Sequence, residues 1–176
     1  DEETDDTLVS YLNQQNIGYY RGNLENVFLR FKNCLQNHSC DWFFRICGDS
    51  PFLSVQLFEV AIDSIQNGVD VDLVTNVHPR PRTFPEGVSV ELLNRNAFKS
   101  INPKLLTSKE KEHVTKYFYN NPDPYQFASL ISNDPSLGER SLAVDTLEDI
   151  KKLEQNGQTI YSDVINKMSP VKIQHG

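Results

Sequence analysis

The sequence predicts an α/β domain in which helices and strands alternate along most of the chain. Its 176 residues, of which 38% are hydrophobic and 23% charged, suit one globular domain of ordinary size. Apolar residues recur at helical spacing in several segments, and the short apolar runs between them are typical of buried strands. We expect a single domain over residues 1–168, followed by a C-terminal tail at 169–176.

In the first half, the pattern predicts three helices and three strands in alternation. Helices are expected over residues 6–15, from 22 or 23 to 35, and over 54–66. Strands are expected over residues 17–21, 42–47 and 71–76. The second of these strands is almost entirely apolar, which favours burial on both faces.

The second half is less regular. Three prolines between His78 and Gly87 exclude a regular element, and residues 88–93 then alternate like a half-exposed strand. Thr107 and Glu110 form a capping box that predicts a helix to about residue 120. Short apolar runs follow at 127–132 and 142–144, then a helix over 146–155 closed by Gly157, and a short helix over 161–168.

Charge and composition exclude several classes of protein. The formal net charge of −7 argues against a nucleic-acid surface, which needs clustered Lys and Arg. No apolar run approaches the roughly 20 residues of a membrane span, and the acidic start is unlike a signal peptide, so we expect a cytoplasmic protein. Three cysteines without CxxC spacing are interpreted as reduced thiols.

Two aspartates directly follow apolar runs. Asp49 comes after the run that ends at Cys47, and Asp145 comes after "LAV". Ligands of open α/β sheets bind outside the carboxyl ends of strands, so the two carboxylates are candidate ligands for Mg²⁺. Each also fits a structural role, Asp49 as a turn residue and Asp145 as a helix cap, and composition alone does not decide between these interpretations.

Five stretches in order, Tyr19-Tyr20-Arg21-Gly22, "RICGDSPF", "RTFPEGVSVELL", "EHVTKYF" and "LAVDTLEDIKKL", resemble the cytidylyltransferase-like family of sugar nucleotidyltransferases. The spore-coat polysaccharide branch, related to enzymes that make CMP-linked keto-sugar acids, is the most similar. The resemblance implies a Rossmann-like three-layer α/β/α fold with a mixed, mostly parallel sheet. The family's first strand, basic glycine-containing loop and helix have no counterpart here, so the fold is expected to be N-terminally incomplete.

The resemblance implies transfer of CMP from CTP to a sugar or sugar acid, with release of pyrophosphate and with Mg²⁺ assisting in-line attack, in the synthesis of a surface polysaccharide or glycan. Asp49 and Asp145 match the family's catalytic, metal-binding carboxylates, and Arg21 and Gly22 match a pair near the sugar. The alternative is a catalytically inactive module of the same fold that binds a ligand or partner. No nucleic acid or membrane partner is expected, and a homodimer remains open.

Further residues are candidates for substrate binding. Arg45 and Gly48 precede Asp49, where Arg45 either approaches the nucleotide or serves the structure, and Gly48 permits close approach of a ligand. Arg80, Arg82 and Glu91 are expected to clamp an acidic sugar, with solvated loop arginines as the alternative. His113 is expected in mid-helix, either touching substrate or serving the structure.

Overall fold

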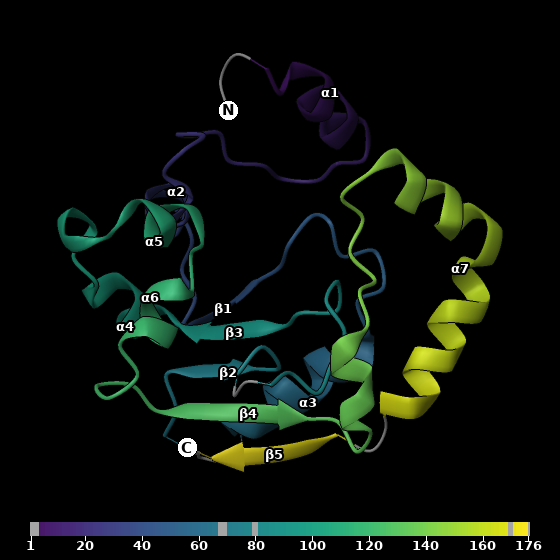
Figure 1. Ribbon diagram of the computed structural model, residues 1–176. Helices are drawn as coiled ribbons and strands as arrows, with labels where there is room; N and C mark the ends of the chain where they lie inside the picture. Colours follow the sequence, from purple (N-terminus) through teal and green to yellow (C-terminus); the bar gives the residue numbers. More distant parts are fainter. Residues whose placement is uncertain (1–3, 67–69, 79–80, 169–170, 176) are drawn as a thin grey trace. The chain divides into compact units, whose positions relative to one another are not determined.

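A computed structural model describes residues 4–66, 70–78, 81–168 and 171–175. By its internal contacts the chain divides into two compact units, one of residues 1–41 and 96–122 and the other of residues 42–95 and 123–176. The second unit holds the sheet and the C-terminal helix (Figure 1). Whether residues 1–168 behave as the single domain predicted from the sequence stays a prediction.

The sheet has five strands in the order β1-β3-β2-β4-β5. Their bounds are Trp42–Arg45 for β1, Leu73–Thr75 for β2, Glu91–Asn94 for β3, Phe127–Ile131 for β4 and Lys172–His175 for β5. Strand β3 is antiparallel to both of its neighbours, β2 is parallel to β4, and β5 is antiparallel to β4. Strands β1, β2 and β4 therefore point one way, and β3 and β5 point the other way.

The predicted fold class, an α/β domain with a mixed sheet, is confirmed, but one detail needs correction. Antiparallel pairings outnumber parallel ones among the described strands, so the sheet is not mostly parallel in its ladders. The reason is that β3 is inserted between two strands of the opposite direction. The last strand, β5, also forms where the sequence predicts only a tail.

One face of the sheet packs against helix α3, Val55–Gln66, which begins and ends close to its predicted bounds. Leu57 and Ala61, four residues apart on one side of this helix, are almost completely buried. The rings of Phe44 on β1 and Phe58 on α3 meet edge to face at 4.8 Å. Leu92, the register partner of Phe44 on β3, belongs to the same core. The hydrophobic core of this unit therefore lies on the α3 side.

The C-terminal helix α7, Leu147–Met168, is one helix of 22 residues, and the prediction of a stop at Gly157 is wrong. Phe52 explains the continuity: its ring lies 3.7 Å from where a Cβ of Gly157 would be, and it stacks on Tyr161 at 5.9 Å. This packing along one side supports the helix across the glycine. Figure 1 shows α7 at the end of the sheet toward which β4 points.

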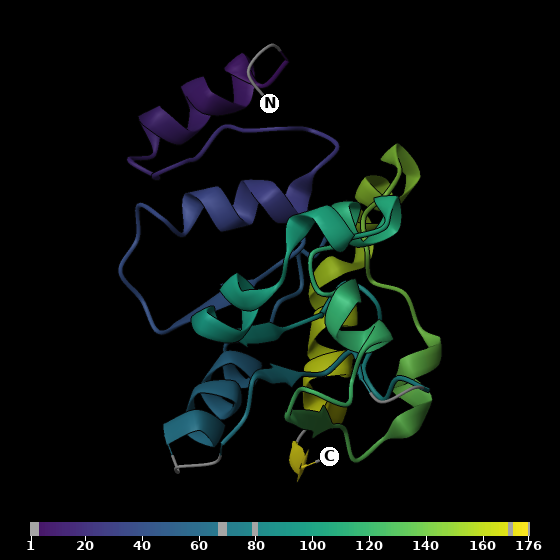
Figure 2. The same cartoon turned by 90° about the vertical axis from the view of Figure 1, so that its left-hand side faces the viewer.

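The first unit is helical. Its helices are α1, Asp6–Gln14; α2, Val27–Cys34; α5, Ser108–Glu112; and α6, Lys116–Asn120; helix α4, Arg95–Ser100, and the 3₁₀ turn Pro103–Leu105 also belong almost wholly to it. Phe28 of α2 and Phe98 of α4 are fully buried, with ring centroids 4.5 Å apart. Figure 2 shows the long irregular connection between α1 and α2.

Three predictions for this unit differ from the structure. Residues 17–21 form no strand, and α2 begins only at Val27, because Asn26 caps it by accepting from the N–H of Leu29 at 3.0 Å. The Thr107–Glu110 capping box is confirmed. The helix it opens ends at Glu112, however, since His113 adopts an extended backbone conformation with ψ of 95°.

Candidate active site

Polar side chains are buried along one edge of the sheet. Because β1, β2 and β4 point the same way, their carboxyl ends meet at this edge, where ligands of α/β proteins bind. The buried polar residues in or next to these strand ends, and at the start of β3, are Thr75, Asn76, Glu91, Ser129 and Ser132. Burial of polar groups is costly unless they are paired. The Asn76 side chain is paired, since it donates to the Val88 carbonyl at 2.8 Å and accepts from the Val90 N–H at 2.9 Å.

Four of the polar side chains at this edge form a row across the sheet. Arg45, Glu91, Thr75 and Ser129 are register partners on β1, β3, β2 and β4, so their side chains project from the same face. The row two residues further into the sheet on that face is wholly apolar and consists of Phe43, Leu93, Leu73 and Phe127. The polar row therefore marks where the apolar interior gives way to the edge.

The centre of the row is an ion pair between neighbouring strands. Arg45 Nη1 lies 3.1 Å from Glu91 Oε2, and the Glu91 side chain is 2% exposed against 20% for that of Arg45. The sequence predicts that Glu91 acts together with Arg80 and Arg82, whereas in the structure Glu91 forms its ion pair with Arg45. Its role as a substrate ligand stays a prediction.

Asp49 lies in the turn that follows β1. Its carboxylate Oδ1 accepts a hydrogen bond from the Ser50 hydroxyl at 2.9 Å, and the residue is half-buried. Its backbone carbonyl accepts from the N–H of Val144 at 2.9 Å. This bond brings the segment carrying Asp145 alongside the turn carrying Asp49, although the two aspartates are far apart in the sequence.

Asp145 does not cap helix α7. The cap consists of Thr146 and Asp149: the Asp149 carboxylate accepts from the Thr146 N–H at 2.9 Å, and the Thr146 hydroxyl accepts from the Asp149 N–H at 3.2 Å. Hydrogen bonds from the Thr146 hydroxyl and backbone lower the pKa of Asp149. Asp145 is exposed, and only its backbone N–H joins this network, at 3.3 Å from Asp149.

We call residues 138–145, which lead from the 3₁₀ turn Pro135–Glu139 to Asp145, the strap. The strap is held by a backbone ladder in which the Glu86 N–H donates to the Arg140 carbonyl at 3.1 Å and the Leu142 N–H donates to the Glu86 carbonyl at 2.8 Å. Gly87 has a φ of 84°, and a Cβ there would lie 2.4 Å from the Ala143 nitrogen. The chain thus approaches the strap more closely than a side chain would allow.

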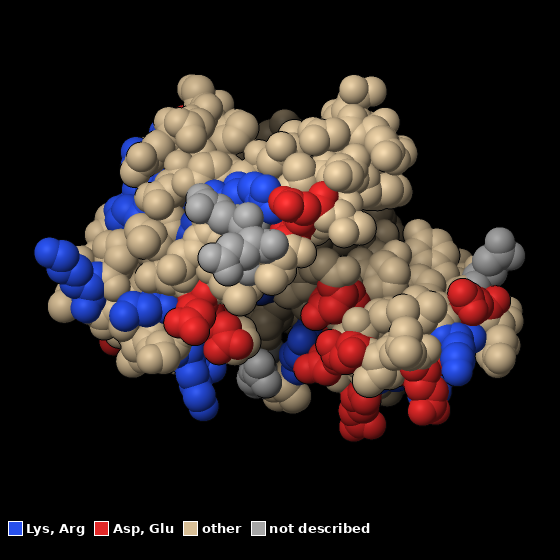
Figure 3. Space-filling view, turned by 90° about the horizontal axis from the view of Figure 1, so that it is seen from above, with Lys and Arg blue, Asp and Glu red and all other residues tan. Residues whose placement is uncertain are grey.

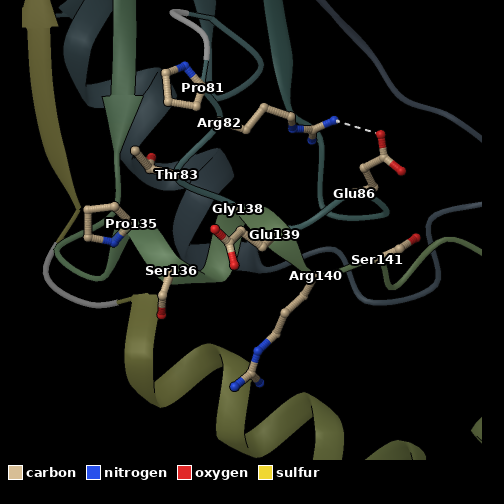
Figure 4. A pocket seen from close by; sticks show the side chains of 10 residues that line it. All are labelled: Pro81, Arg82, Thr83, Glu86, Pro135, Ser136, Gly138, Glu139, Arg140 and Ser141. Atoms are coloured by element: carbon tan, nitrogen blue, oxygen red, sulfur yellow. Dashed lines mark ion pairs between the residues drawn. The ribbon is translucent and has the colours of Figure 1, made fainter.

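A hollow of about 660 Å³ lies beside the strap, lined by residues 81–83, Glu86, Pro135, Ser136 and residues 138–141 (Figure 4). Arg82 bonds the Pro85 carbonyl at 3.1 Å and the Ser89 hydroxyl at 2.8 Å, and it faces Glu86 at 3.9 Å. Arg140 also lines the hollow, and its side chain extends away from Arg82 toward α7 (Figure 4); no sequence pattern singled it out. Arg80, predicted alongside Arg82, lies outside the described residues.

Cys47 lies among the charged groups of the edge. Burial raises the pKa of its thiol, Arg45 opposes this shift, and the negative charges of Asp49 and Glu91 add to it. Gly48 next to Cys47 is exposed, and a Cβ there would meet nothing within 4 Å, so the structure leaves open space at this turn.

The remaining candidates lie in the first unit, and their part in a common site stays a prediction. Arg21 pairs with Asp6 at 2.6 Å. A Cβ on Gly22 would lie 3.1 Å from the Arg30 side chain, so this glycine permits a close local contact. The sequence predicts His113 in mid-helix, but the residue is exposed and follows the last residue of α5.

The surface charges and the side chains able to bind a metal bear on which ligands the protein could hold. Both acidic and basic side chains are exposed at the surface (Figure 3). Within the described part of the chain there is no group of three or more His, Cys, Asp and Glu suited to a metal, and no helix long and apolar enough to cross a membrane. Asp49 and Asp145 are two oxygen donors, and Mg²⁺ commonly uses one or two carboxylates together with substrate phosphates.

Comparison with known proteins points to one class. The chain is 29% identical over 157 residues to the spore coat polysaccharide biosynthesis protein SpsF of Bacillus subtilis, covering 88% of this chain and 62% of SpsF. It is 27% identical to the uncharacterized protein MJ1063 of Methanocaldococcus jannaschii, covering 85% of this chain and 60% of that protein. The chain thus spans about three fifths of the length of these relatives. No family model matches the sequence.

The fold is shared with a solved structure, a cytidylyltransferase from Leptospira borgpetersenii, with a TM-score of 0.82 and 20% identity. The similarity covers 94% of this chain and 71% of that one. The nucleotidyltransferase fold predicted from the motifs is therefore confirmed. Together with SpsF, it confirms the resemblance to the cytidylyltransferase-like sugar nucleotidyltransferases.

Proposed function

We propose that the protein acts as a cytidylyltransferase that transfers CMP from CTP to a hydroxyl of a sugar or sugar acid, in the synthesis of a surface polysaccharide or glycan. The observation that supports this most is the 2.9 Å bond from the Val144 N–H to the Asp49 carbonyl, which sets two aspartate-bearing segments side by side at the carboxyl edge of the sheet. The names of SpsF and of the Leptospira enzyme support the same class.

Asp49 and Asp145 are the residues that would hold Mg²⁺. Two carboxylates fit this ion. Asp145 is exposed and is not used as a helix cap. The Asp49 carboxylate accepts a hydrogen bond from the Ser50 hydroxyl. When bound, Mg²⁺ neutralises phosphate charge and orients the α-phosphate for in-line attack. The chain's own contribution is to keep both carboxylates in place, by the turn after β1 and by the strap.

The acceptor sugar is proposed to occupy the hollow beside the strap. Its walls offer two guanidinium groups, two carboxylates and several hydroxyls, which is the donor and acceptor variety that a polyhydroxylated ligand needs. The strap joins the hollow to Asp145 directly, because Ser141 lines the hollow and lies only four residues before Asp145. We propose that a sugar hydroxyl held in the hollow lies near Asp145, at the carboxyl edge of the sheet.

Pyrophosphate release tests this function. Two proteins are compared with CTP, Mg²⁺ and a panel of sugars and sugar acids: this chain, and a longer form preceded by the basic glycine-containing segment expected for the family. We expect turnover from the longer form and none from this chain alone, because that segment is expected to carry most contacts to CTP. Robust turnover by this chain alone would contradict the assignment of CTP binding to that segment. CTP binding without turnover in the longer form would favour the inactive module instead.

A further inference from the structure

We propose that Arg45 binds a phosphate group of the nucleotide, and that Glu91 is a positioning residue that holds the Arg45 guanidinium at the edge of the sheet. This inference rests on the proposed function for the identity of the ligand. It rests on the geometry of β1 and β3 for the roles of the two residues.

The pair is fixed by the sheet itself. Arg45 and Glu91 are register partners on adjacent antiparallel strands, and Nη1 and Oε2 are 3.1 Å apart. Glu91, at 2% side-chain exposure, has lost nearly all of its water, whereas the Arg45 side chain keeps 20%. The Glu91 carboxylate is therefore the buried member of the pair, and the Arg45 side chain is the member that remains accessible to solvent.

Fold stability alone is a weak reason for this pair. Removing two charges from water costs several kcal/mol per ion, so replacing a buried pair by apolar residues is often neutral or stabilising. The next row on the same face is apolar throughout, so apolar side chains would suit this position. Retaining a charged pair at the carboxyl edge is more easily explained by a ligand.

The charges around Arg45 indicate which ligand. Asp49, a proposed ligand of the divalent cation, lies four residues further along the chain, in the turn that follows β1. A divalent cation held by carboxylates also binds substrate phosphates. A guanidinium at this point offers five N–H donors in a planar fork, and the bond to Glu91 uses one nitrogen of that fork. The fork suits phosphate oxygens.

The sign of the effect separates positioning from simple charge. Changing Glu91 to Leu removes a negative charge, which by Coulomb's law alone would strengthen the binding of an anion. If Glu91 acts by holding Arg45, the same change weakens binding, because the guanidinium loses its fixed direction. Glu91→Gln keeps an oxygen acceptor of almost the same shape and should preserve the position of Arg45.

The test is calorimetric titration of the longer form, which carries the basic glycine-containing segment, with pyrophosphate, CTP, UTP and cytidine, each with Mg²⁺. We expect Arg45→Met and Glu91→Leu each to weaken pyrophosphate binding by about tenfold or more, the cost of losing a charge-assisted hydrogen bond. Glu91→Gln should stay near wild type, and cytidine binding should be unchanged in every variant. Lys152→Met, which removes an exposed charge from α7, is the matched control and should have no effect.

The double variant Arg45→Met/Glu91→Leu guards against a folding defect. It should unfold at a temperature close to that of the wild type, since it replaces the pair by apolar groups, and still lose pyrophosphate binding. Wild-type affinity in the double variant, or stronger binding in Glu91→Leu, would overturn the proposal. If the wild type binds pyrophosphate in an Arg45-dependent way but does not distinguish CTP from other nucleotides, the cytidylyltransferase function fails while this inference stands. Absence of any pyrophosphate binding in the wild type overturns the inference itself.

Discussion

Replacing Gly138 by Ala should break the contact that holds the strap. A Cβ at this position would lie 1.8 Å from the Arg82 carbonyl oxygen and 2.6 Å from its carbon, whereas ordinary contact begins at 3.4 Å. The obstacle is backbone, so one segment has to move by well over an ångström. Overpacking of this kind costs about 3 kcal/mol. In a chain of this length, that cost lowers the melting temperature by roughly 6–12 °C.

Gly157→Ala is the matched control for this prediction. Its Cβ would meet Phe52 at 3.7 Å, an ordinary contact, and alanine favours the helix by about 1 kcal/mol over glycine. We expect this variant to melt at the same temperature as the wild type or higher when unfolding is followed by far-ultraviolet circular dichroism. The reasoning is refuted if Gly138→Ala melts no lower than Gly157→Ala, because the close approach of the strap to Arg82 would then carry no constraint.

Two further predictions concern the hollow and the helical unit. Arg82→Ala should weaken binding of the acceptor sugar while leaving CTP affinity nearly intact, as measured by titration with each ligand; equal loss of both affinities would point to a folding defect instead. Hydrogen bonds from Asn120 and Thr107 lower the pKa of Glu110 below the ordinary value of a glutamate side chain. The ionised Glu110 carboxylate therefore stabilises the folded state at neutral pH, and this stabilisation is lost as the pH falls through the lowered pKa of the folded state. The wild type should lose more stability than Glu110→Gln between neutral and acidic pH. Parallel acid-unfolding curves for the two proteins would argue against this role.

Local chemistry made part of the fold predictable from the sequence. The apolar stripe of α3, the strands β1, β2 and β4, and the Thr107–Glu110 capping box all follow from periodicity and capping rules, and each is present. Strand β1 is only partly buried, however, rather than covered on both faces, because it lies at the end of the strand order, beside β3. The prediction failed where distant parts of the chain decide the outcome. Phe52 carries α7 across Gly157, and β5 forms because β4 offers an edge to pair with, and neither contact is visible in a local pattern.

The candidate site was predictable in the same partial way. Asp49 and Asp145 were singled out because they follow apolar runs, and the structure sets their segments side by side. The pairing of Arg45 with Glu91 depends on the register between β1 and β3. This register cannot be predicted from the sequence unless the two strands are already known to be neighbours. Arg140 was missed because its place beside the hollow arises from the ladder between Glu86 and the strap, which joins segments distant in sequence.

Mn²⁺ binding to the longer form, followed by electron paramagnetic resonance with Mn²⁺ in place of Mg²⁺ and with CTP present, tests whether Asp49 and Asp145 form one metal site. Asp49→Asn and Asp145→Asn change volume very little and should both remain folded. We expect each single variant to bind much less Mn²⁺ than the wild type. The double variant should bind little less than either single variant, because both carboxylates belong to the same site. Wild-type Mn²⁺ binding in either single variant would contradict the account.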